Sequence, residues 1–187
     1  MAGDELTIVV VCTANQCRSP LAAAVLQARL AARMVPAAVV SVGTDAVGAP
    51  ATPPTVDAAN RLGLDLDLSE HTSRPLDAAA LANADLVIAM ERRHVQEAVV
   101  KATTSFAHTF TLKELVRRGS EIGPRGADET LDGWLARVHL GRKPMDLLGS
   151  SRDDDIADPT VSAIVDHDAM AREVLDLVDR LVALAWP

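Results

Sequence analysis

Apolar runs rich in β-branched residues alternate along the chain with segments whose apolar positions have helical spacing. The runs occupy Leu6–Val11, Ala38–Val42, Ala84–Met90 and Phe106–Leu112, and turn residues bound each of them. Their apolar positions are largely continuous rather than alternating, which is typical of strands covered on both faces. An order of strand, helix, strand predicts a parallel sheet with right-handed crossovers.

Helical spacing is clearest near the C-terminus, at Val174, Leu177, Val178, Leu181, Val182 and Ala185. Start and stop signals favour further helices from Pro20 to about Met34, from Pro54 to Leu62 with Gly63 closing, and from Glu91 to about Lys101, with a short turn near Leu76. We therefore expect an α/β fold of the three-layer, doubly wound class, with a four-stranded parallel sheet and helices on both faces. Such sheets bind ligands beyond the carboxyl ends of their strands.

The composition fits one compact domain. The 187 residues are 49% apolar, which suffices for a single domain over residues 1–187 and is too little for two. The net charge of -8 disfavours nucleic acid or a membrane surface as the main partner. The chain begins with acidic residues, and the apolar run after them is too short to span a bilayer, so we expect a cytoplasmic protein.

A cysteine stands where the first strand ends and the next helix begins. Cys12 and Arg18 bracket a loop long enough to wrap one phosphate, with the guanidinium returning to hold two oxygens. Ser19 is a good helix cap and Pro20 is preferred at the first helical position, so backbone N–H groups should point into the loop. The junction is expected to bind an oxyanion.

The same surroundings favour the thiolate of Cys12, which is the nucleophilic form. A helix N-terminus, a guanidinium and converging N–H donors each stabilise the anion. Cys12 is therefore our candidate nucleophile for phosphoryl transfer. The alternative is a structural cysteine, because cysteine is often buried in apolar strands. The joint spacing of Cys12, Arg18 and Ser19 argues against that alternative.

The segment Cys12-Thr-Ala-Asn-Gln-Cys-Arg18-Ser-Pro resembles the signature loop of the low-molecular-weight protein tyrosine phosphatases, and Asn15, Cys17, Ser19 and Pro20 fall on matching positions. The resemblance implies that family's fold and no cofactor. It also implies a phosphocysteine intermediate on Cys12, a grip on the phosphate by Arg18, and a thiolate stabilised by Ser19. The implied phosphate-binding loop, or P-loop, consists of Thr13, Ala14, Asn15, Gln16, Cys17 and Arg18.

The family also carries an aspartate before a proline near the C-terminus, and Asp158-Pro159 matches it. By resemblance, Asp158 protonates the leaving alcohol and then activates water against the phosphocysteine. The alternative is an ordinary turn in an acidic run. We interpret the neighbouring Asp153, Asp154 and Asp155 as a solvated face and expect no metal site there.

Other segments follow the family's pattern in order, namely Val42-Gly-Thr, Val47-Gly-Ala-Pro, His71-Thr-Ser-Arg74-Pro-Leu and Ala84-Asp-Leu-Val-Ile-Ala-Met90-Glu. His71 matches a histidine that braces the loop asparagine in family members. The resemblance therefore implies a contact between His71 and Asn15. A solvent-facing His71 is the alternative.

Two departures from the family concern substrate choice. Ala14 stands where glycine is usual and tolerates fewer backbone angles. Thr160 and the stretch Thr44-Asp-Ala stand where relatives that accept phosphotyrosine carry aromatic residues, and the chain has no tyrosine, two phenylalanines and two tryptophans. We expect the aromatic sandwich for a phenyl ring to be missing, which leaves the preference for phosphotyrosine open.

Both cysteines of the chain, Cys12 and Cys17, lie in the loop, so no disulfide framework or zinc set is expected. If Cys12 is oxidised to a sulfenic acid, Cys17 is close enough in sequence to condense with it. We hypothesise a reversible disulfide that protects the nucleophile.

Residues 119–152 form a longer connection than typical relatives have at this place. Long connections are often lids, and Arg137, Arg142 and Lys143 could contact an anionic substrate. The alternative is a solvated loop with a short helix over Leu131–Val138.

Three functions fit this sequence. The first is hydrolysis of a phosphorylated protein, phosphotyrosine by resemblance, or of a small phosphomonoester, with a protein tyrosine kinase pathway as the source of a protein substrate. The second is arsenate reduction on the same scaffold with an external small thiol, because no cysteine follows Cys17. The third is a non-catalytic phosphate-binding module. The joint presence of Cys12, Arg18 and Asp158 argues against the third, because binding alone needs neither a nucleophile nor an acid.

Overall fold

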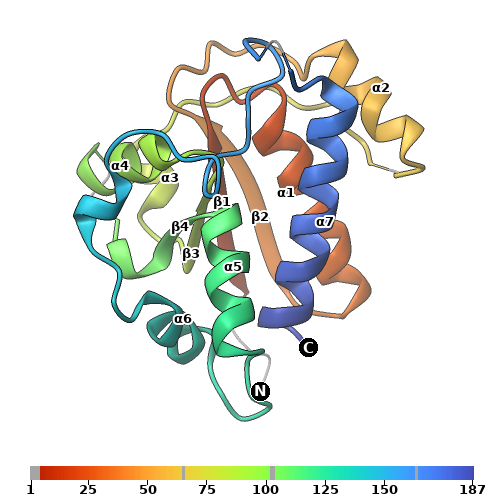
Figure 1. The fold of residues 1–187 in the computed structure, drawn as a ribbon. Helices are drawn as coiled ribbons and strands as arrows, with labels where there is room; N and C mark the ends of the chain where they lie inside the picture. Colours follow the sequence, from red (N-terminus) through yellow and green to blue (C-terminus); the bar gives the residue numbers. More distant parts are fainter. Residues whose placement is uncertain (1–4, 65, 102–103, 163) are drawn as a thin grey trace.

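The computed structural model describes residues 5–64, 66–101, 104–162 and 164–187. Within these residues one sheet contains four parallel strands in the order β2-β1-β3-β4. The strands are β1 (Leu6–Cys12), β2 (Ala37–Gly43), β3 (Leu86–Ala89) and β4 (Thr109–Thr111). Helices lie on both faces of the sheet (Figure 1), so the expected fold class is confirmed.

The described helices are α1 (Arg18–Ala32), α2 (Pro53–Arg61), α3 (Ala78–Leu81), α4 (Arg92–Lys101), α5 (Leu112–Ile122), α6 (Leu131–His139) and α7 (His167–Ala185). Short 3-10 turns cover Phe106–His108 and Pro144–Leu147. Helices α1, α2 and α5 pack against α7 on one side of the sheet, while α4 contacts β3 and β4 on the other (Figure 1). No helix in the described part of the chain is long and apolar enough to cross a membrane.

Strand β1 lies inside the sheet, and its side chains enter two cores. Ile8 and Val10 join the core beneath α1 and α7, whereas Val9 and Val11 join the core beneath α3 and α4. All four are at most 1% exposed, and full burial of such a side chain stabilises the fold by roughly 1.5–3 kcal/mol. This arrangement explains why the apolar positions of the strand are continuous rather than alternating.

The predicted bounds of the strand Phe106–Leu112 are wrong at both ends. Phe106–His108 forms a 3-10 turn, and β4 contains only Thr109–Thr111. The Thr111 hydroxyl accepts the N–H of Glu114 at 3.1 Å and so caps a helix that starts at Leu112. Helix α5 was not predicted, because the apolar character of Leu112 was assigned to the strand before it.

The start of α1 also differs from the prediction. The helix begins at Arg18, and Cys17 occupies its N-cap position without a side-chain cap. Ser19 and Pro20 therefore lie inside the first turn. Because Ser19 does not cap the helix, its hydroxyl is free to turn towards the end of β1.

The segment 119–152 packs into the molecule rather than forming a solvated loop. Its predicted short helix is present as α6, whose Trp134 is fully buried. Gly119 of α5 allows this approach, since a Cβ there would lie 2.9 Å from Trp134 Cζ2. The segment therefore extends the core beside α5.

Candidate active site

The loop from Cys12 to Arg18 joins β1 to α1 at the carboxyl edge of the sheet (Figure 1). The end of β2 holds it in place, because the N–H of Thr44 donates to Cys12 O at 3.0 Å and that of Asp45 to Thr13 O at 2.9 Å. Gly43 must be small, since a Cβ there would come within 2.4 Å of Thr13 O.

The thiol of Cys12 is buried beneath this loop, with 2% of the residue exposed. The N–H of Asn15 points to Sγ at 3.3 Å, and Ser19 Oγ lies 3.0 Å from Sγ. When Cys12 is a thiolate both groups act as donors, so they stabilise the anion. Cys12 and Ser19 are thus in contact, and their roles as nucleophile and thiolate-stabilising group stay predictions.

Asn15 organises the back of the loop in a left-handed conformation, with φ of 55°. Its side-chain amide donates to Ser19 Oγ at 2.9 Å and to Ser41 Oγ at 2.8 Å, and its Oδ1 accepts the N–H of Arg74 at 2.9 Å. His71 Nε2 lies 2.7 Å from Asn15 O and must be the donor, because a carbonyl only accepts. The structure therefore has His71 in contact with Asn15 rather than facing solvent.

The side chain of Arg18 is 1% exposed and its terminal nitrogens are fully engaged. Nη1 pairs with Glu91 and donates to Ile156 O at 3.0 Å. Nη2 donates to Thr13 Oγ1 at 3.2 Å and to Asp158 Oδ2 at 2.5 Å. The guanidinium thus lies between the loop and the acidic segment predicted to carry the general acid.

Asp158 is brought to the loop from a distant part of the chain, as expected. Burial tends to raise the pKa of its carboxyl, but the hydrogen bonds from Thr160 and the charges of Arg18 and Arg93 outweigh burial and hold the pKa below its ordinary value. Thr160 Oγ1 donates to Asp158 Oδ1 at 2.7 Å. Thr160 therefore contacts the acid itself, a role that the sequence did not indicate.

The remaining predicted loop residues are placed around these groups. Ala14 and Gln16 are half-buried in the loop, and Cys17 is buried with its Sγ 3.3 Å from Thr52 Oγ1. Both cysteines are free thiols in the described structure.

Three further side chains reach the site from the segment after β3. Glu91 pairs with Arg18, Arg93 donates to Thr13 Oγ1 at 2.8 Å, and His94 Nε2 lies 3.1 Å from the same hydroxyl. Sequence reasoning missed them, although a usable signal exists. Strand β3 is parallel to β1 and pairs with it, so polar residues just after both strands meet at one edge of the sheet.

The acidic run before Asp158 is not a solvated face throughout. Asp153 is exposed, but Asp154 is 5% exposed and receives the side chains of Arg92 at 2.6 Å and Arg117 at 2.8 Å. Asp155 accepts the N–H of Arg92 at 2.8 Å. The interpretation is therefore wrong for Asp154 and Asp155. Burying a carboxylate requires cationic or N–H partners, and Arg92 of α4 and Arg117 of α5 supply them.

Two of the three basic residues of segment 119–152 that were expected at an anionic substrate, Arg137 and Arg142, pair with carboxylates of the fold. Arg142 is buried and pairs with Glu114 at 2.7 Å, and its guanidinium stacks on the rings of Phe106 and Phe110 at 4.2 and 3.9 Å. Arg137 pairs with Glu129 at 2.8 Å, and Lys143 is exposed. The hypothesis that Arg142 contacts a substrate is wrong, since its charge is neutralised inside the fold.

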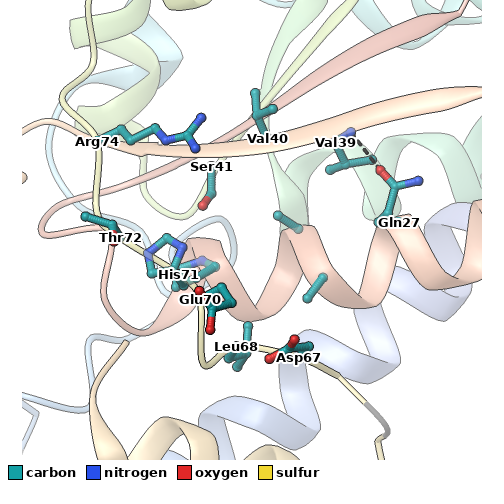
Figure 2. A pocket seen from close by; sticks show the side chains of 13 residues that line it. Gln27, Val39, Val40, Ser41, Asp67, Leu68, Glu70, His71, Thr72 and Arg74 are labelled. Carbon is teal, nitrogen blue, oxygen red and sulfur yellow. Dashed lines mark hydrogen bonds between the residues drawn. The ribbon is translucent and has the colours of Figure 1, made fainter. Parts of the chain in front are cut away.

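Two cavities flank the loop. One of about 310 Å³ lies behind it, where Ser41, His71 and Arg74 form part of the wall (Figure 2). The other, about 270 Å³, opens beside the acid and is lined by Glu91, Arg93, Asp158 and Val161 among others. The second cavity therefore lies beside Asp158, the predicted general acid.

Comparison with known proteins agrees with the geometry of the loop. The sequence model of the family described as low molecular weight phosphotyrosine protein phosphatase matches residues 7–122. EpsP of Ralstonia solanacearum, a probable low molecular weight protein-tyrosine-phosphatase, is 34% identical over 136 residues, which cover 72% of this chain and 90% of the relative.

Two other similar proteins act on a different phosphoamino acid. The protein-arginine-phosphatase of Bacillus subtilis is 34% identical over 124 residues, 65% of this chain and 81% of the relative. A solved structure of the arginine phosphatase YwlE, a cysteine-to-serine variant with a phosphorylated active-site serine, is 26% identical and has a TM-score of 0.68 over 95% of this chain and 94% of that one. This chain therefore belongs to the low molecular weight phosphotyrosine protein phosphatase family, and it is an enzyme of the phosphatase type.

Proposed function

We propose that this protein hydrolyses phosphomonoesters on proteins, phosphotyrosine first among them, through a phosphocysteine intermediate on Cys12. The observation that carries the proposal is the convergence of a buried thiol with two hydrogen-bond partners, a guanidinium and a carboxyl at one loop. The phosphorylated serine at the active site of the YwlE variant supports a covalent intermediate at the position of a loop nucleophile.

In the first step Cys12 Sγ attacks phosphorus and the bond from phosphorus to the leaving oxygen breaks. Asp158 gives its proton to that oxygen. In the resting site Arg18 and Thr160 hold the pKa of Asp158 low against its burial. A bound phosphate dianion competes for Arg18, so it weakens one of the contacts that keep Asp158 ionised and favours the protonated acid.

In the second step Asp158, now ionised, takes a proton from water, whose oxygen attacks the phosphocysteine and releases inorganic phosphate and the thiolate. Arg18 and the loop N–H groups stabilise the equatorial oxygens in both steps. Ser19 and Asn15 stabilise the thiolate when it leaves.

The first experiment measures hydrolysis of para-nitrophenyl phosphate from pH 5 to 8 by the wild type and Cys12→Ser. We expect turnover in the wild type and its loss in the variant, which should still bind inorganic phosphate. Mass spectrometry of the acid-quenched wild type should show a phosphate adduct on Cys12. A fully active Cys12→Ser variant would exclude the mechanism.

Inactivity towards esters with thiol-dependent arsenate reduction would favour a reductase instead, and inactivity towards both would favour a binding module.

Phosphoarginine is a second candidate substrate, and a specific observation favours it. Of the four phenylalanine and tryptophan residues in the chain, Phe106 and Phe110 stack on Arg142, while Trp134 and Trp186 are buried. None is therefore available to hold a phenyl ring at the loop. Carboxylates line the cavity beside Asp158. Glu91 already pairs with Arg18 and Arg93, but Asp158 loses its partner when a phosphate takes Arg18, and a guanidinium group prefers carboxylates.

A matched pair of peptides that differ only in phosphotyrosine or phosphoarginine decides between these substrates. The ratio of their kcat/KM values, measured with the same enzyme preparation, identifies the preferred residue. A ratio above about tenfold in either direction corresponds to 1.4 kcal/mol of discrimination and would settle the class.

A further inference from the structure

Three hydrogen bonds converge on the hydroxyl of Thr13 within the loop. Arg18 Nη2 lies 3.2 Å from Thr13 Oγ1, Arg93 Nη2 lies 2.8 Å from it, and His94 Nε2 lies 3.1 Å from it. A guanidinium can only donate, so both arginines use lone pairs of Oγ1. The single proton of the hydroxyl is then left for His94, and Nε2 of the ring must be the acceptor.

The environment of the His94 ring agrees with this assignment. The residue is fully buried. Burial, opposed by the charge of Glu91 and assisted by that of Arg18, lowers the pKa of His94 to about 3. The ring is therefore neutral, and with Nε2 as the acceptor its proton is on Nδ1.

The Nδ1 atom has no hydrogen-bond partner among the residues that the structure describes. A buried donor without a partner is destabilising, because folding removes its hydrogen bonds to water and replaces them with none. An apolar residue of similar size would avoid that cost. What the histidine ring provides at this position, and an apolar side chain would not, is the hydrogen bond at Nε2. This suggests that the contact with Thr13 has a role other than stability.

We propose that His94 is a positioning residue for phosphoryl transfer, because by accepting the proton of Thr13 it directs the lone pairs of that hydroxyl towards Arg18 and Arg93. This inference rests on the proposed function, in which Arg18 holds the transferring phosphate. When phosphate displaces Asp158 from Arg18, the contacts with Thr13, Glu91 and Ile156 O remain and keep the guanidinium plane aimed at the phosphate.

Two pairs of variants test the role of the hydrogen bond separately from that of volume. His94→Met keeps an apolar side chain of similar length without the acceptor, and His94→Gln offers an oxygen near the position of Nε2. Thr13→Val removes the hydroxyl and keeps the shape, whereas Thr13→Ser keeps the hydroxyl. The matched control is His108→Met, because His108 is a partly exposed partner of Asp132 outside the loop.

We expect His94→Met and Thr13→Val each to lower kcat for para-nitrophenyl phosphate by roughly 10- to 100-fold, the size of a small misplacement of a catalytic group. KM should change less than about threefold, because the contact matters most in the transition state. The inhibition constant for vanadate, which adopts the trigonal bipyramidal geometry, should weaken in parallel with kcat. The constant for inorganic phosphate should change little.

The conservative variants and the double variant complete the test. His94→Gln and Thr13→Ser should recover most of the activity. Thr13→Val with His94→Met should be no worse than the poorer single variant, because His94 acts through the hydroxyl that Thr13→Val already removes. The thermal midpoint of each variant should also be measured, because it distinguishes a loss of positioning from a loss of folding. If His94→Met does not fold, Thr13→Val and Thr13→Ser carry the comparison.

The inference is overturned if His94→Met behaves like the wild type or His108→Met. It also fails if His94→Gln and His94→Met lose equal activity, or if the effects of Thr13→Val and His94→Met simply add. A failure of the proposed function looks different, since the wild type would then not turn over the ester or Cys12→Ser would remain active.

Discussion

Arg18 has two carboxylates as partners in the resting site, and this pairing changes how Asp158 must work. The guanidinium pairs with Glu91 and Asp158 while it is almost completely buried. A buried guanidinium without partners would be strongly destabilising, so the two carboxylates stabilise the loop. Under the proposed function a phosphate replaces one of these partners, and substrate binding is then coupled to the release of Asp158 from Arg18.

Replacing Asp158 by asparagine should slow the enzyme most for substrates with poor leaving groups. A general acid contributes about 10²- to 10⁴-fold, and leaving groups that are stable as anions need it least. We expect the loss in kcat to be larger for phenyl phosphate than for para-nitrophenyl phosphate, as measured by burst and steady-state kinetics. Equal losses for both esters would remove Asp158 from the role of acid.

Oxidation of the loop should be reversible because of Cys17. Peroxide converts the Cys12 thiolate to a sulfenic acid, and the thiol of Cys17 can condense with it to form a disulfide and water. We expect a thiol reductant to restore activity in the wild type and a loss of two mass units in the oxidised protein. In Cys17→Ser, excess peroxide should instead oxidise the sulfenic acid of Cys12 further to a sulfinic acid, which a thiol does not reduce, so activity should be lost permanently. Wild-type activity that a thiol cannot restore would contradict the hypothesis.

The acid segment owes its position to the start of α4. Asp154 receives Arg92 and Arg117, Asp155 caps the N–H of Arg92, and the N–H of Ile156 donates to Met90 O at 2.8 Å. These contacts join the segment before Asp158 to the end of β3. The segment that carries Asp158, the proposed general acid, is therefore attached to the sheet edge that carries the loop.

Asp154→Asn should lower the free energy of unfolding at pH 7 by about 2 kcal/mol, which is the size of the contribution of hydrogen bonds to charged groups. The loss should not be larger, because both arginines are partly exposed to solvent. Burial raises the pKa of Asp154, but Arg117 and Arg92 outweigh it and the pKa lies below its ordinary value. The stabilisation is thus present above an ordinary pKa of about 4 and disappears as pH falls through the lower native value.

Urea denaturation at pH 7 and pH 3 measures this difference, which should shrink at the lower pH. The matched control is Asp153→Asn, because Asp153 is the exposed neighbour. No difference between the two variants at pH 7 would show that the ion pairs of Asp154 do not hold the segment.

At the level of the whole molecule, segment 119–152 belongs to the core rather than to a lid. Trp134 lies against Gly119, and Arg142 joins Glu114 of α5 to Phe106 O and Thr109 O. A domain that includes this segment should unfold with the rest of the chain. That the chain is one domain remains a prediction, and a single cooperative transition by two spectroscopic probes would support it.

Arg142→Met should destabilise the protein by about 3–5 kcal/mol, because it leaves Glu114 buried without its partner. Adding Glu114→Gln should recover part of the loss. The control is Arg137→Met, whose partner Glu129 is at the surface, and it should change the thermal midpoint little. An equal effect of Arg142→Met and Arg137→Met in thermal denaturation would contradict the structural role of the buried pair.

Much of the loop was predictable because its chemistry is local. Cys12, Asn15, Arg18 and Ser19 lie within a few residues of one another, and the spacing of a strand end and a helix start restricts where they point. The strands and most helices were predictable because burial on both faces leaves continuous apolar runs. The boundary between β4 and α5 was not, since the cap at Thr111 competes with the apolar pattern around it.

The order of residues alone therefore determines the sheet, the phosphate loop and the chemical class, because each depends on contacts between near neighbours or on periodic burial. Tertiary contacts determine which groups share that loop. Thr13 and His94 are 81 residues apart, and Arg18 and Asp158 are 140 apart. The first contact depends on the parallel strands β1 and β3 ending at one edge of the sheet, whereas the second depends on the hydrogen bonds that attach the segment before Asp158 to that edge. Burial likewise decides which charged residues are structural. The sequence alone would assign Arg142 and Asp154 to the surface, because only the tertiary structure shows their buried partners.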